Sequence, residues 1–404
     1  MSVRDQLPDS ISSMEPMIPQ ASSIGELGDR VFDLVHKASA FAGSIAPVTA
    51  SGVGDLVRSM NCYYSNLIEG HHTHPLAIDS AMEADYSENK EQRDLQLEAR
   101  AHIEVQRAID AGAYAELWRV SQTDFLRTIH REFCKRLPDD LLVVDHPKTG
   151  DVLSVVPGEF RTHEVQVGRH IPPSAASLPR FMVRFEEAYT PARLTKIEQV
   201  VAVAASHHRF AWIHPFLDGN GRVGRLFSHA WLKELGVGNT LWSVSRGLAR
   251  SVSRYKALLQ AADQPRRGDR DGRGALSERA LLDFCAYFLE TCVDQVSYME
   301  ALLKPDTFVT RLEIWCERQV REGRLADRSF PVLREAFIAG TVDRRRMPEL
   351  TGYQDRKARD VMYKLVDQKL LVADSARGPL RLGFPIGAAM EWFPKLYPED
   401  PGSL

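Results

Sequence analysis

The stretch HPFLDGNGRVGR, residues 214–225, lies between two segments whose apolar residues recur at helical spacing. Ahead of it, residues 195–212 place apolar side chains three and four positions apart, which predicts a helix. Behind it, a second helical pattern covers residues 221–235, and Gly236 follows as a C-terminal stop. The stretch is therefore expected to form a short loop that opens onto the first turn of a helix.

The residues at this junction suit the binding of an anion. Gly219 and Gly221 flank Asn220 at the predicted helix start, where unpaired backbone N–H groups and the helix dipole can face a negative charge. Arg222 and Arg225 lie three residues apart, so both guanidinium groups fall on one side of the helix and can hold phosphate oxygens. The junction therefore predicts a phosphate-binding site.

Two more side chains of the stretch add chemistry to that site. Asp218 supplies a hard oxygen ligand of the kind that Mg²⁺ prefers, and His214 is a group that can take a proton near neutral pH. The chain has no GxxxxGK[ST] P-loop, and no strand precedes GNGRVG as a dinucleotide-binding fold requires. A base, a metal ligand and a phosphate clamp thus occur together in one short stretch.

The stretch resembles the signature of the Fic family (filamentation induced by cyclic AMP), HPFx[DE]GNGRxxR, at every position. The resemblance covers roughly residues 25–300. It implies a mainly α fold, a Fic helical bundle with a short β-hairpin flap. It also implies an enzyme, a protein adenylyltransferase that moves AMP from ATP to a Tyr, Thr or Ser hydroxyl of a target protein with Mg²⁺ or Mn²⁺ as cofactor.

The resemblance implies a role for each residue of the stretch. His214 would deprotonate the attacking hydroxyl, and Asp218 would hold the metal ion. The remaining residues would bind the nucleotide and assist the transfer: Gly219, Asn220, Gly221, Arg222 and Arg225. In the related Doc proteins, which phosphorylate, a lysine follows the asparagine and fills the anion nest. Gly221 leaves that nest open, which favours AMP transfer.

The match is looser away from the stretch. Family members commonly carry an Asn and then a Tyr-Tyr pair at the adenine pocket, whereas this chain has Arg250 at the Asn position and keeps Tyr255, which is expected to contact the nucleotide. A hairpin is expected over residues 152–172 and resembles the family's target-docking flap. An ordinary surface hairpin is the alternative. The edge that would pair with a target segment comprises His163, Glu164, Val165, Gln166, Val167 and Gly168.

Upstream, the stretch SNLIEG, residues 65–70, resembles the inhibitory motif [ST]xxxE[GN] of the Fic family. The resemblance implies that Glu69 pairs with Arg225 and that Ser65, one turn earlier, anchors the helix. The protein would then be inhibited by its own N-terminal helix. Three histidines that follow are interpreted as part of a polar loop, with a metal site as the alternative: His71, His72 and His74.

From about residue 306 the pattern changes to helix, helix, turn, helix and a Gly-Pro-tipped hairpin, which indicates a winged helix-turn-helix. Residues 343–369 hold eight basic and five acidic side chains, a net of +3. Contact with DNA phosphates is one interpretation, and dimerisation or protein docking is the other. Two rival functions follow: a DNA-binding regulator with a nucleotide-sensing Fic core, or removal of AMP at the same site with Glu69 orienting water.

The composition of the whole chain sets outer bounds. A net charge of −3 over 404 residues gives no polycationic character, and 44% hydrophobic residues exclude wholesale disorder. Five cysteines without a CxxC pair, a polar N-terminus and no long apolar run lead us to expect a cytoplasmic protein; a homodimer is left open. The expected divisions are a flexible arm (1–23), a catalytic core with its inhibitory helix (24–305) and a winged helix-turn-helix domain (306–404).

Overall fold

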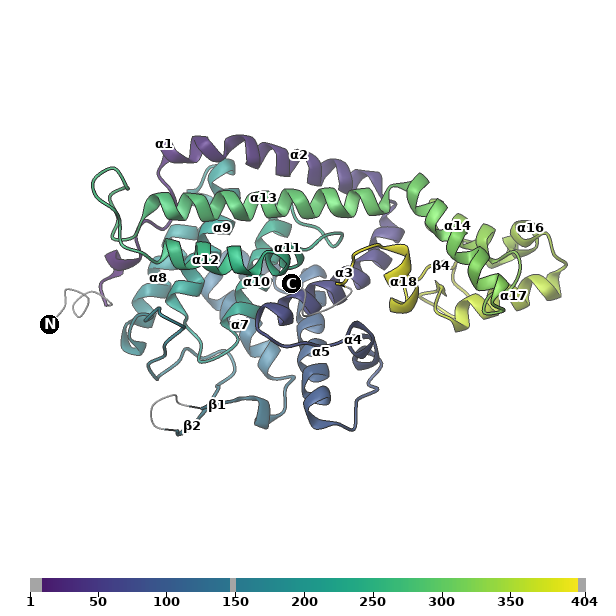
Figure 1. Cartoon of the computed structure of the whole chain (residues 1–404), viewed down its shortest axis with the longest axis horizontal. Coiled ribbons are helices and arrows are strands. Elements are labelled where there is room, and N and C mark those ends of the chain that lie inside the picture. Colours follow the sequence, from purple (N-terminus) through teal and green to yellow (C-terminus); the bar gives the residue numbers. More distant parts are fainter. Residues whose placement is uncertain (1–8, 146–149, 399–404) are drawn as a thin grey trace.

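The computed structural model describes residues 9–145 and 150–398 and is mainly helical (Figure 1). Thirteen helices of the described chain make up the larger body: α1 (Ala21–Ile24), α2 (Gly28–Ser44), α3 (Pro47–Ile68), α4 (Pro75–Met82), α5 (Lys90–Asp110), α6 (Ala115–Val120), α7 (Gln122–Cys134), α8 (Leu178–Tyr189), α9 (Lys196–Ile213), α10 (Asn220–Glu234), α11 (Val244–Arg250), α12 (Val252–Ala262) and α13 (Glu278–Leu303). The mainly α fold expected from the sequence is confirmed.

Helices α9 and α10 pack against each other at the centre of the body. Helix α9 is buried along nearly its whole length because its middle, VVAVAAS, carries only small and apolar side chains. A capping box closes its N-terminus, where Thr195 and Glu198 satisfy each other's backbone N–H groups. Helix α10 adds Phe227 and Trp231 to an aromatic cluster with Trp118 of α6. The loop between these two helices is therefore held by a rigid core.

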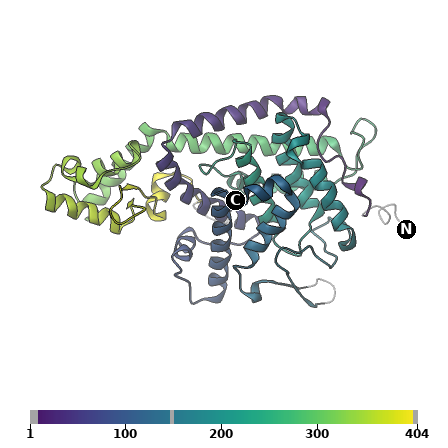
Figure 2. The same ribbon diagram turned by 180° about the vertical axis from the view of Figure 1, so that it is seen from behind.

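Helices α2 and α13 run alongside each other over one face of the body, as both views show (Figures 1 and 2). Within the described ranges, no single helix is both long and apolar enough to cross a membrane. The segments Gly25–Ser44 and Pro47–Ile68 meet the length and composition criteria only as a pair, and the pair is bent by 117°.

The described part of the N-terminal segment differs from the expected flexible arm. Between Asp9 and α1, its backbone is bound to the body: the carbonyl oxygen of Pro16 accepts hydrogen bonds from Arg209 Nε and Nη2 at 3.0 and 2.8 Å. The carbonyl oxygen of Met17 accepts one from the Tyr189 hydroxyl at 2.6 Å. Because Arg209 and Tyr189 are fully buried, this segment completes the core. Residues 1–8 lie outside the described part of the chain.

The observed hairpin lies earlier in the chain than the expected one. Strands β1 (Val143–Asp145) and β2 (Val152–Ser154) pair antiparallel, with Val143 opposite Ser154. After β2, the pattern that predicted strands up to residue 172 gives only an isolated bridge between Val167 and His170. The predicted hairpin edge at residues 163–168 is therefore an exposed loop in this structure.

Arg161 explains why this loop is not a strand. Its backbone N–H donates to the carbonyl of Pro215, and its buried side chain donates to the carbonyls of His214, His163 and Pro173. These bonds satisfy backbone groups that a neighbouring strand would otherwise pair. They also tie the loop to the end of α9.

The C-terminal module extends from one end of the body (Figure 1). Its elements are α14 (Pro305–Arg321), α15 (Ser329–Ile338), α16 (Met347–Thr351), α17 (Asp355–Asp367), β3 (Leu371–Val372), β4 (Arg381–Leu382) and α18 (Ile386–Trp392). Three helices, α14, α15 and α16, precede the turn where the sequence predicted two, and α18 was not predicted either. The winged helix-turn-helix stays a prediction. After α18 the chain returns to the body, where the Tyr397 ring contacts those of Tyr63 and Tyr64 on α3.

Candidate active site

The loop between α9 and α10 holds the predicted site residues in a fixed backbone. Helix α9 ends at His214, which has a left-handed φ of 49°, and Gly219 precedes α10 with a φ of 78° that favours glycine. The side chain of Asn220 closes the loop, because its Oδ1 accepts from the Phe216 N–H at 2.9 Å and its Nδ2 donates to the Phe216 carbonyl at 2.8 Å. Asn220 therefore shapes the loop, and the nest of backbone N–H groups is left to face a ligand.

His214 is half-buried at the end of α9. Burial lowers the pKa of its imidazole to about 4, and the positive charge of Arg161 contributes to the shift. The side chain of Arg161 also donates to the His214 carbonyl at 2.9 Å, which holds the backbone that carries the imidazole. His214 is consequently neutral near pH 7, the state in which it can accept a proton.

Arg225 is brought together with both residues of the predicted inhibitory motif. Its Nη2 lies 2.5 Å from Glu69 Oε1, and its Nε donates to the Ser65 hydroxyl at 2.9 Å. Burial would raise the pKa of Glu69, but the charge of Arg225 and their hydrogen bond outweigh it and lower that pKa. The same Glu69 oxygen lies over Gly221, where a Cβ would collide with it. The carboxylate thus covers the start of α10 and holds its second arginine.

Arg222 has a carboxylate partner that the sequence did not indicate. Its Nη1 lies 3.1 Å from Glu98 Oε2, and its Nη2 lies 3.3 Å from Asp218 Oδ2. Glu98 belongs to α5, and the sequence of this helix has the many charged residues that are typical of a solvent-facing helix. Only the packing of α5 against α10 reveals the pair, so a single sequence carries no signal for it.

The residues around Asp218 fit a Mg²⁺ ion that accompanies a nucleotide. The Asp218 side chain is 54% exposed, so its carboxylate can reach a ligand outside the protein. Among the described residues, the buried Nε and Nη1 of Arg222 have no hydrogen-bond partner, and the Nη2 of the same guanidinium group lies 3.3 Å from this carboxylate. A carboxylate, an unpartnered guanidinium N–H and the glycine nest together suit a metal-bound phosphate group.

Tyr255 does not line the cavity beside this loop. A cavity of about 270 Å³ lies between the C-terminal end of α3 and helices α11 and α12, and it is lined by Leu67, Ile68, Glu69, Gly70, His72, Ala249, Val252 and Lys256. The Tyr255 ring is buried behind it, and its hydroxyl lies 2.7 Å from His207 Nε2. The predicted contact between Tyr255 and the nucleotide stays a prediction, and in this structure the Tyr255 hydroxyl is paired with His207 inside the core.

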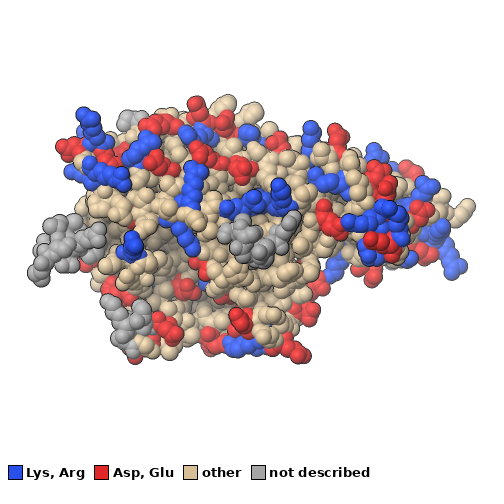
Figure 3. Space-filling model, in the orientation of Figure 1, with Lys and Arg blue, Asp and Glu red and all other residues tan. Residues whose placement is uncertain are grey.

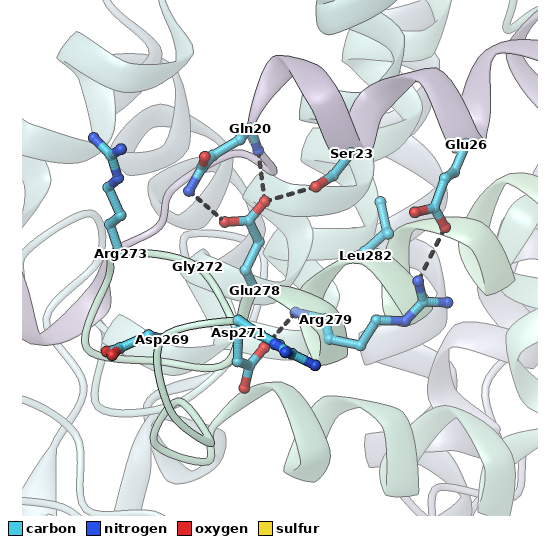
Figure 4. Close-up of a pocket in the computed structure, with 11 residues that line it drawn as sticks. Gln20, Ser23, Glu26, Asp269, Asp271, Gly272, Arg273, Glu278, Arg279 and Leu282 are labelled. Carbon is cyan, nitrogen blue, oxygen red and sulfur yellow. Dashed lines mark hydrogen bonds and ion pairs between the residues drawn. The ribbon is translucent and has the colours of Figure 1, made fainter.

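A larger cavity, of about 310 Å³, lies at the start of α13, and none of the predicted site residues lines it (Figure 4). At its wall, the carboxylate of Glu278 accepts hydrogen bonds from the backbone N–H and Nε2 of Gln20 and from the Ser23 hydroxyl. These bonds tie the start of α1 to the start of α13. The polar residues at this wall of the cavity therefore have a structural role, because they join α1 to α13.

The loop defines a class of site: a helix start with a glycine nest and two arginines, preceded by a neutral histidine at the end of α9, which suits transfer at a phosphate group. Residues 120–232 match the model of the Fic/DOC family. Two curated relatives named protein adenylyltransferase Fic, from Drosophila erecta and Drosophila virilis, are each 30% identical over 143 residues, or 34% of this chain.

These matches span only 29% and 30% of the length of the two relatives. Among solved structures, a Fic family protein from Desulfovibrio desulfuricans G20 aligns with a TM-score of 0.51 at 17% identity, covering 92% of this chain and 99% of that one. Fic-1 from C. elegans aligns with a TM-score of 0.50 at 14% identity, covering 70% and 72%. The structural likeness concerns the fold alone.

Proposed function

We propose that this chain is a protein adenylyltransferase that transfers AMP from ATP to a hydroxyl side chain of a target protein. The observation that carries the proposal is the position of His214, neutral at the end of α9, directly before the glycine nest and the two arginines that open α10. The relatives named adenylyltransferase support the same chemistry.

In this mechanism the target hydroxyl loses its proton to the His214 imidazole while its oxygen attacks the α-phosphorus of ATP. The new O–P bond forms as the bond to the bridging oxygen breaks, and pyrophosphate leaves in line. Backbone N–H groups at the start of α10 face the α-phosphate, and Arg222 and Arg225 hold the β- and γ-phosphates. Asp218 would hold Mg²⁺, which neutralises charge that develops on the phosphates.

Glu69 acts in the proposal as a built-in inhibitor. As long as its carboxylate pairs with Arg225 and lies over Gly221, the γ-phosphate lacks its arginine and part of the nest is covered. ATP that binds in this state would place its α-phosphorus out of line with the attacking hydroxyl. Removing the carboxylate should therefore release the activity.

Self-modification by ATP labelled at the α-phosphate tests both roles. We expect Glu69→Gly to raise labelling at least about tenfold over the unmodified protein, because a misplaced phosphate costs up to roughly 100-fold in rate. Glu69→Gly combined with His214→Ala should label at the background level. Equal labelling in all three proteins would contradict both assignments.

Removal of AMP at the same site is the second activity to consider. In that reaction Glu69 would orient a water molecule, so Glu69→Gly would abolish it rather than raise it. Incubating AMP-modified protein with each variant separates the two: release of AMP that requires Glu69 would favour removal over transfer.

The exposed loop at residues 163–168 is proposed to face the target. Its side chains are exposed or half-buried, and Arg161 anchors its start next to His214. A target segment bound there would bring its hydroxyl close to the imidazole. Because the loop is not a strand, side-chain contacts would carry more of the recognition than main-chain pairing.

DNA contact by the C-terminal module is a further proposal, narrowed by the structure to the first half of α17. Arg345 pairs with Asp343, and Arg346 pairs with Glu335 and Glu349, so two of the predicted basic residues are held within the module. Figure 3 shows acidic side chains among the basic ones on the visible face of the module. The exposed basic side chains of this half are Arg356, Lys357 and Arg359.

Fluorescence anisotropy with a duplex tests the DNA proposal. Replacing both Arg356 and Arg359 with alanine should weaken binding about equally for all sequences and reduce its salt dependence, as expected for phosphate contacts. Absence of salt-sensitive binding by the full chain would leave protein docking or dimerisation as the role of the module.

A further inference from the structure

Glu98 is a buried carboxylate with two partners from different parts of the chain. Its Oε2 lies 3.1 Å from Arg222 Nη1 and 2.6 Å from His71 Nδ1. The Glu98 side chain is 11% exposed and that of Arg222 is 6% exposed, so water screens this ion pair little. Burial would raise the pKa of Glu98, but the hydrogen bond with His71 and the charge of Arg222 outweigh it and lower that pKa.

The surroundings of Arg222 fix the orientation of its guanidinium group. The Phe133 ring covers one face, with its centroid 5.0 Å from the guanidinium carbon. Glu98 Oε2 lies at ion-pair distance from Nη1, which is buried and makes no hydrogen bond among the described residues, whereas Nη2 donates to the partly exposed Asp218 at 3.3 Å. A small cavity beside this group is lined by Glu98, Asp218, Gly219 and Arg222 among others. One corner of the guanidinium is therefore held inside the protein, and the other faces the candidate phosphate site.

We propose that Glu98 is a positioning residue for Arg222, and that its ion pair with Nη1 leaves the Nη2 corner directed toward the phosphates of ATP. This inference rests on the proposed function of the site. Glu98 does not touch the nucleotide; it acts through the arginine. Without it, Arg222 would keep its charge but lose the contact that selects one of its rotamers, and the guanidinium would sample positions in which it does not meet a phosphate.

The same contact links Arg222 to the inhibitory turn. His71 follows Glu69 by two residues, and its backbone N–H donates to the Asn66 carbonyl at 3.0 Å, which closes the end of α3. One short turn therefore reaches both arginines of α10: Glu69 contacts Arg225 directly, and His71 contacts Arg222 through Glu98. A displacement of this turn would change the environment of both.

The test compares Glu98→Ala and Glu98→Gln, each introduced into the Glu69→Gly chain. The matched control is Glu104→Ala in the same chain, because Glu104 is a carboxylate of the same helix that also pairs with arginines, Arg100 and Arg136, outside the site. The affinity for ATP with Mg²⁺ is measured by calorimetry, and the transfer rate is measured at several ATP concentrations. Thermal melting of each variant shows whether it is folded.

We expect Glu98→Ala to weaken ATP binding and to raise the KM for ATP roughly tenfold relative to the Glu69→Gly parent, as for other residues that orient a functional group. Glu98→Gln keeps one oxygen acceptor, so its KM for ATP should lie between those of Glu98→Ala and the parent. Glu104→Ala should have the KM of the parent. Melting temperatures that fall in Glu98→Ala and Glu104→Ala alike would not alter these expectations, because the positioning role is read from the difference in affinity.

Equal ATP affinity in Glu98→Ala, Glu98→Gln and the parent would overturn the inference. Affinity gained by Glu98→Ala would also overturn it, because it would mean that the carboxylate withholds Arg222 from the nucleotide. If the parent binds ATP but transfers no AMP, the proposed function fails while the affinities still decide the role of Glu98.

Discussion

Arg222 and Arg225 each have a carboxylate partner from outside the 214–225 stretch, and the two partners differ in accessibility. Glu69 is 34% exposed and comes from the end of a helix, so a ligand or a movement of α3 can remove it. Glu98 is 11% exposed and comes from the middle of α5, where the helix on both sides restrains it. The first contact therefore suits a switch, and the second suits a fixed support.

Ser65→Ala tests the second anchor of Arg225. The Ser65 hydroxyl accepts from Arg225 Nε at 2.9 Å, and without it the arginine is held to α3 less firmly. We expect a rise in self-labelling of about two- to fivefold, equivalent to a lost hydrogen bond of about 0.5–1 kcal/mol. Ser51→Ala, an exposed serine on the same helix, serves as control. A rate unchanged by Ser65→Ala would contradict the anchoring role.

Tyr255→Phe tests whether the Tyr255 hydroxyl serves the core or the nucleotide. The Ser228 hydroxyl donates to the Gly224 carbonyl and can accept from His207 Nδ1, which leaves His207 Nε2 to accept from the Tyr255 hydroxyl. Removing that hydroxyl leaves a buried acceptor without its donor. We expect the free energy of unfolding to fall by about 1–3 kcal/mol and the KM for ATP to stay unchanged. A higher KM without a change in stability would restore Tyr255 as a nucleotide contact.

Several buried histidines make the stability of the protein depend on pH. Burial lowers the pKa of His102 and His207 to about 3 and that of His130 to about 4. In the unfolded chain these groups titrate near 6.5. Between about pH 6.5 and 4 the unfolded state therefore binds more protons, and the free energy of unfolding should fall as the pH falls through this window.

His102→Leu isolates one of these groups. Neither ring nitrogen of His102 has a hydrogen-bond partner in the described structure, so the substitution removes a titrating group without breaking such a bond. The slope of unfolding free energy against pH should decrease by up to about 1.4 kcal/mol per pH unit, the value for one proton. Denaturant unfolding at several pH values measures it. A slope unchanged by His102→Leu would be evidence against the buried neutral state.

At the scale of elements, α3 connects the C-terminal module to the candidate site. Gly52 lies near its start, where a Cβ would come within 3.1 Å of the Phe384 ring and 3.2 Å of the Leu382 carbonyl. Ser65 lies near its end and contacts Arg225. Helix α3 therefore contacts the C-terminal module near its start and contains the first part of the predicted inhibitory motif at its end.

Gly52→Val tests the contact between α3 and the module. The larger side chain should overpack against Phe384 and lower the free energy of unfolding by about 1–3 kcal/mol. Gly43→Val places the same residue in α2, where no atom lies within 4 Å of the added Cβ, so it should change stability by less than about 0.5 kcal/mol. Equal effects of the two substitutions in thermal or denaturant unfolding would contradict the close packing at Gly52.

The two helices that flank the candidate site could be predicted from sequence because their signals are local. Thr195 and Glu198 cap the N-terminus of α9. Gly236 follows the C-terminal end of α10 and has a left-handed φ of 69°. The hairpin could not be predicted in its observed position. Apolar and polar residues alternate up to residue 172, as in a strand. In the structure, the Arg161 side chain instead donates hydrogen bonds to the carbonyls of His163, Pro173 and His214. A single buried side chain overrode the local pattern.

At the scale of the whole molecule, residues distant in sequence complete the core and the site. The segment after Asp9 is bound by Arg209 and Tyr189, and the chain after α18 returns to α3. No sequence motif marks either of these two contacts, because each is formed by common residues that are far apart in the sequence. Glu98 was missed for the same reason. The signature predicts the reacting groups, whereas the residues that contact them from elsewhere in the chain could be identified only from the three-dimensional structure.

The central claim is that AMP is the group transferred, and ATP labelled at either the α- or the γ-phosphate tests it most directly. Glu69→Gly protein incubated with Mg²⁺ and each form of ATP should acquire label from the α-phosphate and none from the γ-phosphate. Adding His214→Ala should remove that label. Label acquired from the γ-phosphate alone would indicate phosphate transfer and would contradict the account, as would α-label that persists without His214.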